Sequence, residues 1–160
     1  MRQTLRTIVS AALLAITAQS ANAQVVQGPM PFVHIGGVPM HCIAATGQQA
    51  AIYIDPSVDQ NIGIANNNGY PIIVLGPGFF NSVPPVVGQF WFLHECAHHV
   101  VGGNEAAADC YAIRNLRNLG AVRSPGHLQQ ILGQIYNMRG SNRHLPGPPR
   151  AQNIFNCFNS

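Results

Sequence analysis

The chain has 160 residues, of which 47% are hydrophobic and only 8% are charged, and all eight basic residues are arginine. The arginines form no cluster and do not alternate with aromatic residues, so the sequence predicts no nucleic-acid-binding surface. Its length suits a single domain with its own hydrophobic core.

Residues 1–23 are typical of a secretory signal peptide. Arg2 and Arg6 form the charged start, Ile8 to Ile16 the apolar middle, and Ala21-Asn22-Ala23 an A-x-A cleavage site. The apolar run is well short of the ~20 residues that a membrane-spanning helix needs. We therefore expect export, to the periplasm or as a secreted protein.

Cleavage would leave residues 24–160 as one domain without a membrane span. Gln24 to Gly47 contains several Gly and Pro residues and is expected to be mostly loop, with one short strand. Strands are predicted at 50–54 and 70–75, on either side of a polar turn at 66–69. These two strands would form a small sheet.

Three helices are predicted in the second half of the chain. The first begins at the proline-containing segment Asn81–Pro85 and ends at Val101, and its start is apolar on nearly every side, which is typical of a buried helix. The second spans Glu105 to about Leu119 and the third spans Gly126 to Met138. The proline-rich segment 145–150 is expected to be an extended loop. The fold class is α+β, with the small sheet packed on the first helix.

A zinc-binding motif lies on the first helix. His94 and His98 are four residues apart, about 40° apart on one helical face, so both rings can reach one ion. A catalytic zinc takes three protein ligands and a water molecule. Glu95, beside the first histidine, is placed to accept a proton from that water.

The third ligand is expected from the second helix. Gly102-Gly103 predicts the end of the first helix, and Asn104 is a suitable N-cap for the next one. This turn would return Glu105 to the metal, with Asp109 hydrogen-bonding a ligating histidine. The roles of Glu105 and Asp109 could be exchanged.

The distribution of acidic residues supports a metal site. The five acids are Asp55, Asp59, Glu95, Glu105 and Asp109, so three of them accompany the two histidines. Carboxylates on an apolar helix need a strong partner, and a divalent cation is a natural one.

These motifs resemble those of the gluzincin zinc metallopeptidases, in which HExxH is followed by a Glu ligand in a Glu-x-x-x-Asp helix. Here the matching residues are His94-Glu95-Cys96-Ala97-His98 and Glu105 with Asp109. The tail from His144 to Arg150 is similar to the His-Pro…Arg segment of the HtpX-like and CaaX-protease-like branch. The spacing between His98 and Glu105 is shorter here than in those families.

Two tail residues are candidates for a catalytic role. His144 and Arg150 can donate hydrogen bonds, and zinc peptidases need a donor that stabilises the tetrahedral oxyanion. His99 faces about 100° away from the motif and is expected to pack or lie on the surface.

The four cysteines, Cys42, Cys96, Cys110 and Cys157, all lie in the expected mature domain, and two disulfides are predicted for an exported protein. Three connectivities are possible. We favour Cys96–Cys110, which would join the two metal-bearing helices, and Cys42–Cys157. A role for cysteine as zinc ligand is the alternative, but Cys96 lies about 200° from His94 around the helix.

The sequence thus favours an exported zinc metallopeptidase that hydrolyses peptide bonds of a peptide or protein substrate with a metal-activated water. In this interpretation His94, His98 and Glu105 bind Zn²⁺, Glu95 is the general base, and His144 or Arg150 stabilises the oxyanion. The alternative is a non-enzymatic exported domain with a structural zinc that binds a protein partner. Glu95 distinguishes the two, because a structural site has no use for a carboxylate beside its first ligand.

Overall fold

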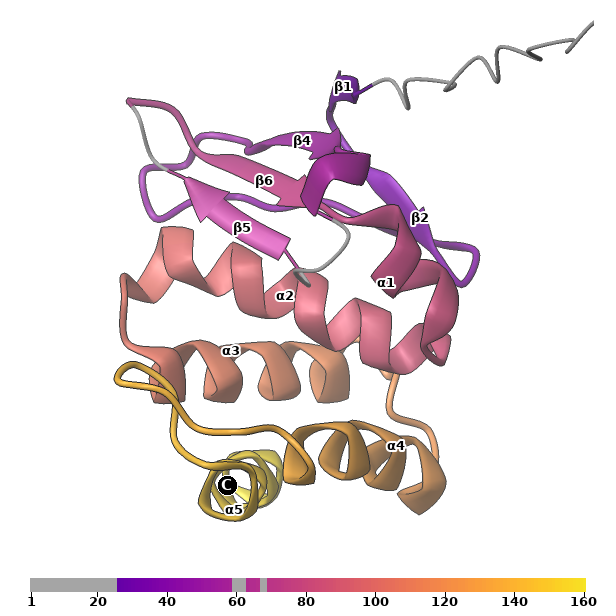
Figure 1. Ribbon diagram of the computed structural model, residues 1–160, viewed down its shortest axis with the longest axis vertical. Helices are drawn as coiled ribbons and strands as arrows, with labels where there is room; N and C mark the ends of the chain where they lie inside the picture. The colour runs from indigo at the N-terminus through magenta and orange to yellow at the C-terminus, as the bar shows by residue number, and fades with distance from the viewer. Residues whose placement is uncertain (1–25, 59–62, 67–68) are drawn as a thin grey trace, which may run out of the picture.

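A computed structural model describes residues 26–58, 63–66 and 69–160 (Figure 1). The predicted signal peptide lies outside these residues. The strands are β1 (Gln27–Met30), β2 (Val33–Ile35), β3 (Val38–Met40), β4 (Ala51–Ile54), β5 (Gly63–Asn66) and β6 (Ile72–Leu75). The helices are α1 (Pro77–Ser82), α2 (Pro85–Val101), α3 (Glu105–Asn118), α4 (Pro125–Tyr136) and α5 (Gly147–Asn159), with a 3₁₀ turn, η1, at Pro56–Val58.

Four strands form a sheet in the order β1-β4-β6-β5, and β2 pairs with β3 in a separate hairpin. The two predicted strands are β4 and β6, which lie parallel and side by side with Ile52 opposite Ile73. Both isoleucines are fully buried. β5 pairs antiparallel with β6 and forms one edge of the sheet. The sequence interpretation missed β5, and it underestimated the strand content before Gly47.

The sheet covers one side of α2, and α3 lies on the other side, followed by α4 and α5 (Figure 1). α2 is therefore enclosed by the fold, and every residue from Val86 to Ala97 is buried. Its apolar residues supply the driving force, since Phe90 and Phe92 are completely removed from water. This arrangement confirms the α+β class with a sheet packed on the predicted first helix. No helix in the described part of the chain is long and apolar enough to cross a membrane.

The prediction that residues 145–150 form an extended loop is wrong, because α5 begins at Gly147. Pro148 and Pro149 lie in its first turn, where a missing backbone N–H leaves no helical hydrogen bond unmade. Arg150, Ile154 and Cys157 then share one buried face of the helix. The proline-rich segment, which the sequence analysis expected to prevent a helix, therefore forms the first turn of α5.

The predicted disulfide pairing is also wrong: the bonds are Cys42–Cys96 and Cys110–Cys157. The reason is the orientation of the helices. His94 faces α3, so Cys96, about 200° further round α2, points away from α3 and towards the segment after β3. Cys110 in turn points towards α5. The bonds join α2 to the N-terminal segment and α3 to α5, and every cysteine is paired.

Candidate metal centre

Two histidines and a glutamate meet at the turn between α2 and α3. α2 ends at Gly102, which adopts a positive φ of 74°, and the Asn104 side chain accepts a hydrogen bond from the N–H of Ala107, 3.0 Å away, at the start of α3. Glu105 is the first residue of α3 and faces back towards α2. Its Oε2 lies 3.2 Å from His94 Nε2 and 3.4 Å from His98 Nε2.

These separations fit a tetrahedral metal site. With bonds of about 2.0–2.1 Å to each ligand atom, neighbouring ligand atoms of a tetrahedral zinc are separated by roughly 3.3 Å. The third separation, between the Nε2 atoms of His94 and His98, is 3.2 Å. Glu105 Oε2 is buried without a properly aligned hydrogen-bond donor, which a cation would satisfy.

His144 approaches the same point from the segment between α4 and α5. Its Nε2 lies 2.9 Å from Glu105 Oε2. His94, Glu105 and His144 form a group whose ligand atoms all lie within 4.8 Å of one another and that could hold a metal ion. The Nε2 atoms of three histidines therefore lie within 3.4 Å of Glu105 Oε2, and their protonation decides which of them can bind a cation with it.

His94 is held by a buried carboxylate and an arginine. Its Nδ1 lies 2.9 Å from Asp109 Oδ1, although the N–H does not point directly at the oxygen. Arg150 donates to both oxygens of Asp109, from Nε to Oδ2 at 2.7 Å and from an Nη to Oδ1 at 2.8 Å. The guanidinium also stacks over the ring of Trp91, 4.9 Å from its centroid.

The exposed fractions of this group are 2% for His94, 1% for Asp109 and 3% for Arg150. The carboxylate oxygen can only accept hydrogen bonds, so the proton of neutral His94 belongs on Nδ1. The lone pair of Nε2 then faces Glu105.

The same reasoning applies to His98. Its Nδ1 is 3.0 Å from the carbonyl oxygen of Gly102, which can only accept. Nδ1 therefore carries the proton, and the Nε2 lone pair faces His94 and Glu105. His99 turns the other way, with Nε2 3.0 Å from the carbonyl of Ile72, in agreement with the expected packing role.

His144 has the opposite pattern, because its partner is a hydroxyl group. Ser141 Oγ accepts hydrogen bonds from the backbone N–H groups of Arg143 and His144, which occupies both of its acceptor positions. The hydroxyl proton of Ser141 is then donated to Nδ1 of His144, 3.1 Å away. This pattern favours the tautomer of the neutral ring that has its proton on Nε2. His144 thus presents an N–H donor, whereas His94 and His98 present lone pairs.

Glu95 lies beside the three histidines and Glu105, and its side chain is buried. It is 8% exposed, and its carboxylate accepts a hydrogen bond from the backbone N–H of Ala65 on β5. Burial raises the pKa of Glu95, and the charges of His94 and His98 offset this only in part. The result is a carboxylate that is a better proton acceptor than one in water.

The remaining pKa shifts follow from the close packing of opposite charges. Burial lowers the pKa of His94, but the carboxylates of Asp109, Glu105 and Glu95 outweigh this and raise it to about 9. The contact with His94 lowers the pKa of Glu105, against the effect of burial. Burial raises the pKa of Asp109, but Arg150 and His94 outweigh it, and the net shift is downward. Burial lowers the pKa of His144.

The side chains of the candidate metal site, including His94, Glu105 and His144, line a cleft of about 880 Å³. One wall is β5 and the α2–α3 turn, and the other is the segment of residues 138–147, here termed the site loop. The site loop is closed at its base by a hydrogen bond from Gly147 N to Met138 O of 3.0 Å. Gly147 is required there, because a Cβ atom would lie 2.1 Å from the carbonyl oxygen of Tyr136.

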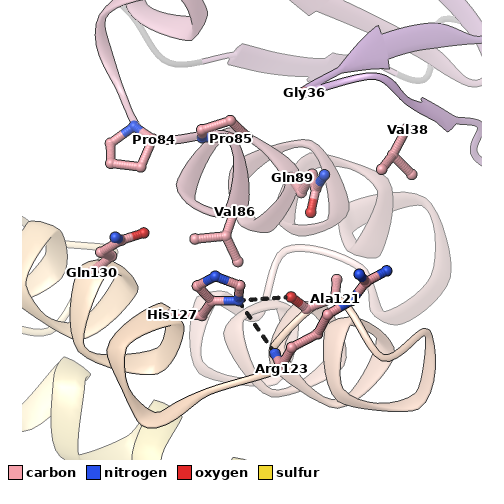
Figure 2. A pocket seen from close by; sticks show the side chains of 10 residues that line it. All are labelled: Gly36, Val38, Pro84, Pro85, Val86, Gln89, Ala121, Arg123, His127 and Gln130. Carbon is pink, nitrogen blue, oxygen red and sulfur yellow. Dashed lines mark hydrogen bonds between the residues drawn. The ribbon is translucent and has the colours of Figure 1, made fainter.

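A second cavity, of about 450 Å³, lies at the other end of α2 (Figure 2). Its wall includes Pro85 and Gln89 of α2 and His127 of α4. The His127 ring contacts the carbonyl of Ala121 and the N–H of Arg123, as the dashed lines in Figure 2 show. Its lining residues contain no carboxylate or cysteine, and His127 is the single histidine among them.

The structure brings most of the predicted site residues together. His94, Glu95, His98, Glu105 and His144 line the cleft, and Asp109 supports His94 from behind. Arg150 also reaches the cleft wall, but its guanidinium is committed to Asp109. Two contributors were missed in the sequence, Ala65 and Ser141, because a backbone N–H and a loop serine carry no motif.

No protein-family model, curated protein or solved structure matches this chain. The chemistry of the site therefore carries the functional inference.

Proposed function

We propose that this protein is a zinc-dependent metallopeptidase in which His94, His98 and Glu105 bind the metal. The observation that carries the proposal is the difference in the Nδ1 partners of the three histidines, which are a carboxylate for His94, a backbone carbonyl for His98 and a hydroxyl for His144. Two of them offer lone pairs at the edge lengths of a tetrahedral site, and the third offers an N–H. The residues thus supply three ligands and leave one coordination position for water or substrate.

Zinc is favoured over other cations by the ligand set. Two imidazoles and one carboxylate in a compact group suit Zn²⁺, whereas Mg²⁺ and Ca²⁺ prefer oxygen ligands in larger number. A zinc ion at this point would polarise the scissile carbonyl and lower the pKa of a bound water.

The chain supplies the remaining steps of peptide hydrolysis. Glu95 accepts a proton from the attacking water as the water oxygen bonds to the scissile carbonyl carbon. It then transfers this proton to the amide nitrogen as the C–N bond breaks, which releases the amine and a carboxylic acid. The Nε2–H of His144 donates to the oxyanion that forms on the carbonyl oxygen. Arg150 fixes Asp109, and through it His94.

The backbone of β5 offers a surface for the substrate. β5 is an edge strand of the sheet, and Ala65 lies at the cleft. An extended peptide could pair with this edge beside Glu95. Export is part of the proposal and is supported by the two disulfides, which persist in oxidising compartments.

A structural zinc in a partner-binding domain is the competing function. It would require His144 as a fourth ligand, which closes the site. The group of His94, Glu105 and His144 gives this alternative its support. The hydroxyl of Ser141 argues against it, since a protonated Nε2 cannot bind a metal.

The test is Glu95→Gln in the purified protein. The amide has nearly the same size and leaves the ligands in place, so zinc content should stay at about one per chain. Peptide cleavage should fall by ~10²–10⁴-fold because the amide accepts no proton. Elemental analysis and a broad peptide library measure the two effects. Equal cleavage by both proteins would exclude the mechanism, and no cleavage by wild type would favour the structural zinc.

A further inference from the structure

The site loop carries two arginines whose guanidinium groups have no partner among the described residues. Arg139 and Arg143 line the cleft, and both are exposed. Among the described residues neither guanidinium forms a hydrogen bond or an ion pair. The other arginine of the cleft, Arg150, is neutralised by Asp109. Two unpaired positive charges thus flank the turn that holds His144.

The carboxylates that line the described part of the cleft do not neutralise them. Glu105 is directed at the three histidines, and Glu95 lies buried against Ala65. Asp109 is buried behind His94. Outside this group, Asp55 is the sole carboxylate side chain of the described residues, and it accepts a hydrogen bond from the N–H of Ser57.

The charge of the loaded cleft follows from these pairs. A divalent cation would be balanced by Glu105 and Glu95, and Arg150 is balanced by Asp109. Among the described residues Arg139 and Arg143 remain, which leaves this part of the cleft with about two positive charges.

We propose that the substrate is an acidic peptide, with Asp or Glu side chains near the scissile bond that pair with Arg139 and Arg143. This inference rests on the proposed peptidase function. The site loop has the construction that such recognition needs, because its base hydrogen bond and the Ser141–His144 hydrogen bond of 3.0 Å hold the arginines beside the catalytic group. The two arginines determine specificity, while His144 on the same loop serves the reaction.

The binding test uses zinc-loaded Glu95→Gln protein, which does not consume the peptide. Two labelled peptides of equal length are compared, one containing Glu on both sides of the scissile bond and one with Gln at the same positions. The acidic peptide should bind roughly tenfold tighter in a fluorescence anisotropy titration at low salt. The preference should weaken as salt is raised, because the arginines are exposed. Equal affinity for the two peptides at low salt would overturn the inference.

Charge reversal distinguishes the cleft from the net charge of the protein. In Arg139→Glu/Arg143→Glu the preference for the acidic peptide should disappear or invert. Arg123→Glu is the control and is compared with Arg139→Glu and Arg143→Glu as single variants, which change the net charge equally. Arg123 is an exposed arginine at the second cavity (Figure 2), whose lining residues include none of the cleft. An acidic preference that survives the double reversal, or that Arg123→Glu abolishes, would contradict the assignment.

Cleavage by the wild-type protein separates this inference from the function on which it rests. If wild type cleaves both peptides with the same kcat/KM and binds them equally, the substrate class is wrong and the peptidase function stands. If the acidic peptide binds through the arginines but neither peptide is cleaved, the binding surface stands and the peptidase function fails.

Discussion

The candidate metal centre is built from two regions of different character. The inner region consists of α2 and α3 with the buried group His94, Asp109 and Arg150, and both helices are linked to other parts of the fold by disulfides. The outer region is the site loop, where His144 has a 33% exposed side chain and Ser141 is exposed. In the proposed function the inner region would fix the metal ligands, whereas the outer region would bring a hydrogen-bond donor and positive charges to the substrate.

This difference has a physical basis in the cost of leaving a group unpaired. Breaking a buried ion pair exposes a charge to a medium that cannot solvate it, while water replaces a lost hydrogen bond on the surface. Substitutions in the inner region should therefore change stability and metal binding together. Substitutions in the outer region should change activity alone.

The largest effect is expected for Asp109→Ala. Arg150 would be left as a buried, unpaired cation, which should lower the free energy of unfolding by about 3–5 kcal/mol. His94 would also lose its Nδ1 partner, so zinc affinity should fall by about 10–100-fold. Urea denaturation and zinc titration measure the two losses.

The double variant Asp109→Ala/Arg150→Met is the control for this substitution. It removes the unpaired charge as well, so it should recover much of the stability but not the zinc affinity. A single variant within about 1 kcal/mol of wild type would show that the inner region does not depend on this ion pair.

A smaller effect is expected from the raised pKa of His94 in chelator-treated protein. Because the folded pKa is about 9 and the ordinary value is 6.5, protonated His94 stabilises the fold fully below pH 6.5. This contribution, about 3 kcal/mol, is lost as the pH rises through 9. Glu105 and Asp109 have lowered pKa values, so they are already ionised throughout this window.

Denaturant titrations between pH 6 and pH 10 measure this loss. With zinc bound, His94 is neutral at every pH in the window, so the decline should be absent. His94→Gln is the control and should remove the pH dependence of the chelated protein. A flat profile for chelated wild type would mean that the inner carboxylates do not hold a proton on His94.

The smallest change in stability is expected for Ser141→Ala in the outer region. The serine is exposed, so the free energy of unfolding should change by less than about 1 kcal/mol. His144 would lose the hydroxyl that keeps its proton on Nε2, and kcat should fall roughly tenfold with zinc content unchanged. Loss of zinc in Ser141→Ala would instead identify His144 as a ligand and favour the structural site.

The sequence alone predicted the parts of the site that depend on local geometry. The i, i+4 spacing of His94 and His98, the glycine turn at 102–103 and the Asn104 cap act within one or two helical turns, so propensity and periodicity reveal them. The helices α2, α3 and α4 were predicted for the same reason. The choice between Glu105 and Asp109 was left open; in the structure Glu105 belongs to the group that could hold a metal ion, and Asp109 lies behind His94.

Only the tertiary structure decided the features that depend on how distant segments pack. Cys96 pairs with Cys42 because α2 turns that face towards the N-terminal segment, and no spacing in the sequence encodes this rotation. Arg150 reaches Asp109 because Pro148 and Pro149 start a helix instead of preventing one. Ala65 contributes through a backbone N–H, which every residue except proline has, and Ser141 contributes through a loop hydroxyl that belongs to no motif. A hydrogen bond between residues far apart in the chain forms only when packing brings its donor and acceptor to within about 3 Å, and a linear pattern does not specify that distance.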